Sequence, residues 1–273
     1  MTIMSRRQQF DFVLGYDFYS FFRHAFKTLH PNLLYEESWH VEVICRAVKD
    51  FMGQDVDQNL VVNAPPRSLK SEIISVALVA YLLGRNPSLR ILCVSYSQQI
   101  ADAFARDTKT LLDADWYRRI FPATRIKRSN ENGIFTTKGG YRRTISVSGS
   151  VTGFGSDLTI IDDPIRADDV YSEAIREKTN SWLDTTLASR ANDKRKAKTI
   201  LVMQRLHVDD PSSTVLRRKL TRHVKLPAIA DKDYLFELSP GRIKRWDADE
   251  PLHDDRLHLG ILAAERANIG ERT

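Results

Sequence analysis

The chain has 273 residues, 42% of them hydrophobic and 28% charged, with a formal net charge of +6, which is enough for one large α/β domain or two small ones. We expect neither a membrane span nor a secretory signal, because residues 1–10 are polar and no apolar run approaches the roughly 20 residues that cross a bilayer. Cys45 and Cys93 sit in apolar surroundings, which predicts a reducing compartment without disulfides, and no Cys/His spacing indicates structural zinc.

From the N-terminus, residues 7–56 are predicted to be helical and to cover the core, because five aromatic residues give them a thick apolar face. These are Tyr16, Phe18, Phe21, Phe22 and Phe26. After them, four short, apolar and β-branched segments are predicted to be core strands. They span residues 60–63, 90–95, 158–161 and 199–203.

Helices are predicted between those strands, at residues 71–83, 97–112 and 171–189. The first should stop before Gly84. The last is expected to carry on one face Ile175, Trp182, Leu183 and Leu187. Alternating strands and helices predict the α/β class, with a mostly parallel central sheet and helices on both faces.

Two segments depart from this alternation. Residues 133–148 predict a hairpin inserted before the strand at 158–161, because two strand-like stretches flank Lys138-Gly139-Gly140. From Asp231 the chain is polar, and residues 242–256 show no convincing core element. We therefore divide the chain into a helical segment (1–56), a core (57–230) and a polar tail or linker (231–273).

Residues 60–71 have the order of a nucleotide phosphate-binding loop: an apolar strand, a short loop ending in Lys-Ser, and an apolar helix. A helix N-terminus suits phosphate because it offers free N–H groups and a partial positive charge. Lys70 would add a full charge near the β- and γ-phosphates, and the Ser71 hydroxyl would ligate Mg²⁺. A plain strand–turn–helix with a surface Lys-Ser is the alternative.

The loop departs from the usual pattern G-x-x-x-x-G-K-[ST], because Ala64 and Leu69 stand where both glycines should be. Leu69 does not readily take a positive φ. We therefore expect the loop to curve by another route, with Pro65 and Pro66 stiffening its entrance.

A second motif follows, where the apolar strand at 158–161 ends in Asp162 and Asp163. Ligands bind at the carboxyl ends of strands in open α/β sheets, and two adjacent carboxylates there are costly without a metal or a cation. Asp162 would hold Mg²⁺, and Asp163 would orient or deprotonate the attacking water. A solvated Asp-Asp-Pro turn is the alternative, but both motifs in this order favour an NTPase.

These residues resemble the ATPase domain of the large terminase subunit of tailed bacteriophages. The matching stretches lie in family order at residues 64–71, 91–97, 115–122, 149–157, 160–169 and 202–211. The resemblance implies a RecA-like P-loop (ASCE-type) NTPase fold, ATP and Mg²⁺ as cofactors, and ATP hydrolysis that moves double-stranded DNA into a procapsid. The glycine-free form of the loop also resembles a variant in this family.

The resemblance implies further site residues. Arg67 resembles a loop arginine proposed to contact the γ-phosphate, where its charge would stabilise the transition state. Trp39 lies in a stretch that resembles the family's segment near the adenine, and its ring would either stack on the base or serve as a core aromatic. Gln204 and Arg205 resemble a motif that couples hydrolysis to movement, and we favour Gln204 as the phosphate sensor. The implied nucleotide contacts are Trp39, Pro66, Arg67, Ser68, Leu69, Lys70, Ser71 and Gln204.

The resemblance also implies partners: double-stranded DNA, a portal protein, a small terminase subunit and further copies of the chain in a ring, in the cytoplasm of an infected or lysogenic bacterial host. Relatives often carry an arginine where this chain has Phe154. If that arginine serves a neighbouring subunit, the substitutes to consider are Arg142, Arg143 and Arg166.

Large terminases resemble one another in carrying a nuclease domain after this point, and residues 231–273 are too few to build it. We therefore expect no nuclease activity from this chain. The carboxylates at Asp247, Asp249, Asp254 and Asp255 are expected to be solvated, and His253 and His258 are not expected to bind metal.

Basic clusters indicate where DNA could bind, because a translocase needs sequence-independent backbone contacts. The preferred cluster is Lys194, Arg195, Lys196 and Lys198, and a solvated face is its alternative.

Two other functions stay open for the whole chain. One is a helicase or repair ATPase, and the other is a catalytically weak, nucleotide-binding assembly protein.

Overall fold

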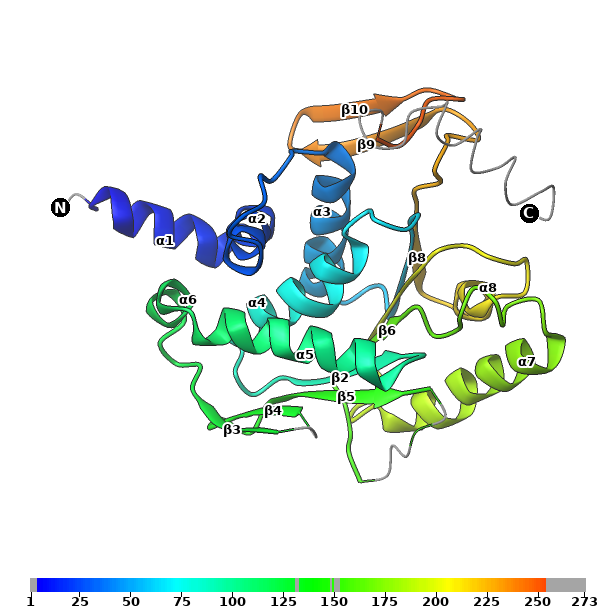
Figure 1. Cartoon of the computed structure of the whole chain (residues 1–273), viewed down its shortest axis with the longest axis horizontal. Helices are drawn as coiled ribbons and strands as arrows, with labels where there is room; N and C mark the ends of the chain where they lie inside the picture. The colour runs from blue at the N-terminus through cyan, green and yellow to red at the C-terminus, as the bar shows by residue number, and fades with distance from the viewer. Residues whose placement is uncertain (1–3, 131–132, 148, 150–152, 254–273) are drawn as a thin grey trace.

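The computed structural model describes residues 4–130, 133–147, 149 and 153–253, and the largest element in them is an eight-stranded sheet (Figure 1). Its strands are β1 (Asn59–Asn63), β2 (Arg90–Ser95), β3 (Ile126–Asn130), β4 (Gly133–Thr136), β5 (Tyr141–Ser146), β6 (Leu158–Asp162), β7 (Lys198–Met203) and β8 (Thr221–Lys225). Their spatial order is β3-β4-β5-β2-β6-β7-β1-β8. The pairs β3–β4 and β4–β5 are antiparallel, and each remaining pair in this order is parallel. The predicted α/β class is confirmed.

The four predicted strands form the centre of this sheet, each within one residue of its expected bounds. They are buried on both faces, as parallel strands between two helical layers require. In β1, Leu60 and Val62 belong to the core on one face, while Val61 belongs to the core on the other. Continuous apolar runs therefore identified these strands, because no solvent-facing position interrupts them.

Helices cover both faces (Figure 1). The larger core lies under α2 (Phe18–Leu29), α3 (Trp39–Gly53), the π-helix η1 (Glu72–Ala77), α4 (Leu78–Arg85), α5 (Gln98–Asp113) and α6 (Asp115–Ile120). The opposite core lies under α7 (Glu173–Trp182), the π-helix η2 (Leu183–Leu187), whose continuation is η3 (Ala188–Arg190), and α8 (Pro211–Leu216). None of the helices in the described ranges is long and apolar enough to cross a membrane.

The N-terminal segment forms the predicted helical cover, with α1 (Arg6–Tyr16) ahead of α2 and α3. Phe18, Phe21 and Phe22 of α2 are fully buried. The expectation for Tyr16 is wrong, because its side chain is 59% exposed. Asp17 ends α1 and caps α2, so Tyr16 does not continue the apolar face of the second helix.

The helix after the phosphate loop differs from its prediction at both ends. It begins as the π-helix η1 and continues through Gly84 to Arg85 as α4. Gly84 is no stop signal, because a Cβ there would lie 2.5 Å from Cδ2 of Phe121. This glycine lets α4 and the Phe121 ring approach closely.

Two other predictions are partly corrected. The hairpin at 133–148 exists as β4 and β5, but β5 also pairs in parallel with β2 and so extends the main sheet. The helix predicted at 171–189 is regular only in α7, and Ile175 is 39% exposed instead of facing the core.

The expectation of an irregular polar tail after Asp231 is wrong. Strands β9 (Tyr234–Ser239) and β10 (Arg242–Trp246) form an antiparallel hairpin next to α3 (Figure 1). Trp246 is 1% exposed and contacts the Trp39 ring at a centroid distance of 5.2 Å. The aromatic residues Tyr234, Phe236 and Trp246 pack on the core and are interspersed with exposed ones, so the average composition concealed the hairpin. The division at residues 56 and 230 stays a proposal.

Trp246 should anchor this hairpin. Trp246→Ala should lower the free energy of unfolding by about 3 kcal/mol, because it removes a large buried ring. Ile243→Ala on the same strand is the matched control, since Ile243 is 64% exposed and should change it by less than about 0.5 kcal/mol. Urea titrations of both variants measure this, and equal effects would show that the hairpin does not pack on the core.

Candidate functional site

The loop between β1 and η1 curves through the conformation that sequence reasoning excluded. Leu69 has a φ of 61° and Arg67 a φ of 62°, so the expectation that Leu69 avoids positive φ is wrong. The left-handed region costs a non-glycine residue about 1–2 kcal/mol. Leu69 packs its side chain against the larger core, and this burial offsets the cost, as a glycine could not.

The loop is closed by local hydrogen bonds. The buried Ser68 hydroxyl donates to the carbonyl of Pro65 at 2.8 Å, and the Ile73 N–H donates to the carbonyl of Leu69 at 2.9 Å. Pro66 and Arg67 are exposed at its tip. Arg67 is therefore open to solvent.

Lys70 and Asp163 bring the two predicted motifs together. Lys70 is 7% exposed, and its Nζ lies 3.6 Å from Oδ2 of Asp163. Asp163 has a φ of 39° and sits just after β6, where its N–H donates to the carbonyl of Val202 at 2.9 Å. This strained backbone turns the carboxylate toward the loop, an arrangement common at functional sites.

Asp162 is the buried partner of this pair, with 4% exposure. Ser71 Oγ donates to its Oδ1 at 2.8 Å, and Ser75 Oγ donates to its Oδ2. Burial, reinforced by the charge of Asp163, raises the pKa of Asp162 to about 7. Sequence reasoning missed Ser75, although a lone hydroxyl in an apolar helix four residues after Ser71 was the available signal.

These oxygens fit Mg²⁺. The Ser71 hydroxyl donates its hydrogen bond to Asp162, which leaves the lone pairs of its oxygen for a cation. Mg²⁺ is usually held by one or two protein oxygens together with phosphates and water. The described ranges contain no group of three His, Cys, Asp or Glu side chains suited to a metal.

The loop after β7 reaches the same site through its backbone. The N–H of Gln204 donates to Oδ1 of Asp163 at 3.3 Å. Arg205 is held within its own loop, since its Nη2 donates to Ser213 Oγ at 2.7 Å. The fully buried Asp210 accepts the N–H groups of Leu206 and Ser212, each at 2.9 Å. Sequence reasoning gave Asp210 no role, although an Asp before Pro at a helix start signals a cap.

Several other predicted residues lie apart from this centre. Trp39 packs on Phe236 and Trp246, so it has the core contacts that were its alternative role. Arg142 is 0% exposed and hydrogen-bonds Thr144. It therefore cannot reach a neighbouring subunit, and that suggestion is wrong.

The remaining two arginine candidates differ in exposure. The guanidinium of Arg143 lies 3.5 Å from the centre of the Phe154 ring, which holds it on this chain. Arg166, three residues after Asp163, has a side chain 60% exposed. Of the three arginines, Arg166 is therefore the remaining candidate for contacting the site of a neighbouring subunit.

The basic cluster before β7 lies at the opposite, amino edge of the sheet. Lys198 is wrong as a DNA contact, because it is 9% exposed and its Nζ donates to the last carbonyls of α3, at Phe51 (2.5 Å) and Gln54. Burial also lowers the pKa of its amine. Lys194, Arg195 and Lys196 are exposed on the preceding loop.

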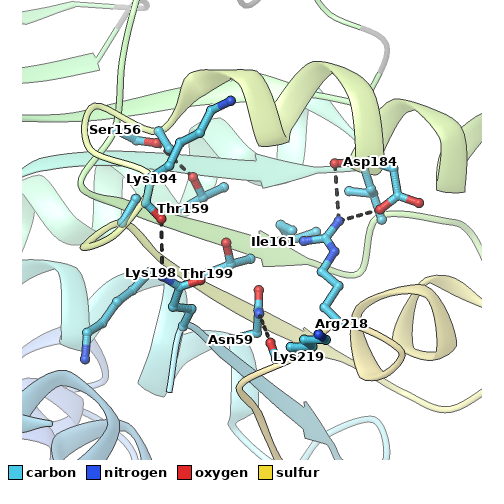
Figure 2. Close-up of a pocket in the computed structure, with 14 residues that line it drawn as sticks. Asn59, Ser156, Thr159, Ile161, Asp184, Lys194, Lys198, Thr199, Arg218 and Lys219 are labelled. Atoms are coloured by element: carbon cyan, nitrogen blue, oxygen red, sulfur yellow. Dashed lines mark hydrogen bonds and ion pairs between the residues drawn. The ribbon is translucent and has the colours of Figure 1, made fainter. Parts of the chain in front are cut away.

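Of these three residues, Lys194 borders a cavity of about 380 Å³ between the start of β1, β6 and β7. Figure 2 shows the Arg218 guanidinium turned toward Asp184, with which it pairs at 2.7 Å. Lys194 and Lys219 lie at the same cavity. The amino edge therefore carries positive charge on the side of the sheet away from the phosphate loop.

The raised pKa of Asp162 predicts a pH-dependent gain from Asp162→Asn. The folded protein binds the Asp162 proton more tightly than the unfolded chain does, so the free energy of unfolding falls as pH rises toward 7. At pH 8 the carboxylate is ionised and destabilises the metal-free fold. The gain in unfolding free energy from Asp162→Asn should be on the order of 2 kcal/mol larger at pH 8 than at pH 5. Denaturant titrations in EDTA test this against Asp168→Asn, an exposed control. A pH-independent gain would contradict it.

Residues 61–271 match the family described as terminase large subunit, T4likevirus-type, N-terminal. No curated protein matches the chain. The large terminase of bacteriophage HK97 is similar in structure, with a TM-score of 0.51 and 15% identity over 85% of this chain and 45% of that one. This chain thus spans less than half of the HK97 protein, and the likeness shows a shared fold.

Two further structures are similar at lower scores. The N-terminal domain of the phi29 DNA packaging ATPase has a TM-score of 0.40 and 12% identity, over 66% of this chain and 94% of that one. A Thermus phage large terminase ATPase domain has a TM-score of 0.44 and 15% identity, over 76% of this chain and 85% of that one. Because the family match alone covers well over half of its residues, this chain belongs to the T4-like family of large terminase subunit N-terminal domains.

Proposed function

We propose that this chain is the ATPase motor unit of a viral DNA-packaging terminase, which hydrolyses ATP with Mg²⁺ to move double-stranded DNA into a procapsid. The observation that carries the proposal is the convergence of Lys70 with Asp163 at 3.6 Å and of Ser71 with Asp162 at 2.8 Å. These are the groups that phosphate binding and water activation need, and they meet at the carboxyl edge of the parallel sheet, where β7 lies between β1 and β6.

Each residue then has a distinct role. The loop N–H groups and Lys70 bind the phosphates, and the exposed Arg67 stabilises negative charge on the γ-phosphate. Bound Mg²⁺, held by Ser71 and Asp162, would neutralise phosphate charge during transfer. Asp163 orients the water as general base, and it becomes free to do so when a triphosphate draws Lys70 away from it.

Two contacts complete the proposed site. Gln204 follows β7 and already touches Asp163 through its N–H, which supports a role in sensing the γ-phosphate. Trp39 begins α3, which packs against η1. The adenine contact is proposed from the resemblance of this segment, since the Trp39 ring itself packs on the hairpin.

The working assembly is proposed to be a ring of these chains, on a portal and with a small terminase subunit, in the cytoplasm of a bacterial host. One site in one subunit cannot grip DNA continuously, whereas a ring can. Arg166 is the candidate for a contribution to the neighbouring site, since its side chain is exposed close after β6.

DNA is proposed to contact the amino edge of the sheet. Lys194 and Lys196 are exposed there, and Lys219 lines the same cavity as Lys194 (Figure 2). Arg195 is partly neutralised, because its Nε lies 3.3 Å from Oδ1 of Asp193. Flexible lysines suit backbone phosphates, which they contact without reading sequence.

Hydrolysis of ATP tests the site. Lys70→Ala and Asp163→Asn should each lower kcat by at least about 100-fold, because they remove phosphate binding and the general base. Steady-state turnover with Mg²⁺, with and without long double-stranded DNA, measures this, and Lys138→Ala on an exposed turn is the control. Stimulation by DNA supports the motor.

Other outcomes separate the alternatives. Tight ATP binding without turnover would favour the nucleotide-binding assembly protein, and strand separation on forked DNA would favour a helicase. Loss of nucleotide binding in the native protein would overturn the loop assignment.

DNA binding should depend on the exposed lysines. Lys194→Glu combined with Lys196→Glu should weaken binding to a 30-base-pair duplex and reduce the slope of log K against log salt by about 2. Fluorescence anisotropy at three salt concentrations measures both quantities. Lys27→Glu with Lys138→Glu reverses as much charge elsewhere on the surface, and an equal loss in that control would show that the amino edge is not the contact.

A further inference from the structure

Ser75 is a buried hydroxyl in a position that packing alone does not explain. It is 1% exposed within η1, between the buried apolar pairs Ile73–Ile74 and Val76–Ala77. Burying an unpaired hydroxyl is costly, and a serine in a helix interior commonly donates to a carbonyl of its own helix four residues back. Ser75 instead donates across to Oδ2 of Asp162 on β6.

The result is a carboxylate held at both oxygens. Ser71 occupies Oδ1 at 2.8 Å, and Ser75 occupies Oδ2. Rotation of an aspartate about its Cβ–Cγ bond is otherwise soft. With one hydroxyl on each oxygen, the plane of the carboxylate is fixed, and the lone pairs not used by the serines point in a defined direction.

The helix that carries both hydroxyls begins as a π-helix directly after Ser71. Its wide turn is closed by the N–H of Leu78, which donates to the carbonyl of Ile73, five residues back. Segments of this kind are frequent at functional sites, where they re-aim side chains. Here the segment lies against β6 and presents Ser71 and Ser75 to the same carboxylate.

We propose that Ser75 is a positioning residue for the divalent metal: it orients Asp162 so that this carboxylate can bind the cation held with the nucleotide, either directly or by accepting a hydrogen bond from a water on that cation. The inference rests on the proposed function. Hydroxyl partners of metal-binding carboxylates typically contribute 10- to 100-fold to metal affinity. The Ser75 hydroxyl donates to Asp162, so its effect should fall on the metal and not on ATP itself.

Mn²⁺ in place of Mg²⁺ gives a direct readout. Free Mn²⁺ is followed by electron paramagnetic resonance while it is titrated into protein with ATP. Ser75→Ala should raise the Mn²⁺ dissociation constant about 10-fold. In EDTA, its affinity for a fluorescent ATP analogue should stay within twofold of the native value. Ser75→Thr keeps the hydroxyl and should restore most of the Mn²⁺ affinity.

Two controls make the outcomes distinct. Thr108→Val removes another fully buried helix hydroxyl, which donates to the carbonyl of Phe104, and it should leave Mn²⁺ affinity unchanged. Asp162→Asn should weaken Mn²⁺ binding more than Ser75→Ala does.

Native Mn²⁺ affinity in Ser75→Ala, together with a loss in Asp162→Asn, would overturn the role of Ser75 and leave the proposed function intact. Equal losses in Ser75→Ala and Thr108→Val would also overturn it, because any buried hydroxyl would then matter. Absence of Mn²⁺–nucleotide binding in the native protein would overturn the proposed function and this inference with it.

Discussion

The buried carboxylate of Asp162 is the constraint on which the site depends. An acid that is 4% exposed must find donors within the protein. Both donors come from the helix that follows the phosphate loop, so satisfying this acid fixes that helix against β6. The same contact sets the place of Lys70 beside Asp163. One desolvated acid thereby holds together two motifs whose serine and aspartate are 91 residues apart.

The centre of the fold and the pairing of the motifs were predictable because each depended on local pattern. Central parallel strands are apolar on both faces, so their sequences are continuous apolar runs. Strand ends in such sheets converge on one edge, which predicted that the loop of β1 and the acids of β6 would meet. Family resemblance supplied the roles of Arg67 and Gln204, which neither periodicity nor charge would have indicated.

What the sequence did not reveal depends on tertiary contacts. Lys198 looks like a member of a solvent-facing basic run, yet helix carbonyls from 144 to 147 residues earlier take up its amine. The hairpin of β9 and β10 is hidden because its packed aromatic residues are interspersed with exposed and charged ones. Leu69 was misjudged because propensity describes an isolated residue, whereas here the core holds its side chain.

The glycine-free loop has a consequence for ligand binding. Glycines make a phosphate loop easy to bend, but they also give it many conformations to lose when a ligand orders it. A loop with two prolines at its entrance and a half-buried leucine packed on the core near its end has less of that freedom to lose when a ligand binds. Such a loop is preorganised for its ligand. Its affinity for phosphate then depends on shape set in advance, and substitutions that loosen it should weaken binding even where they relieve strain.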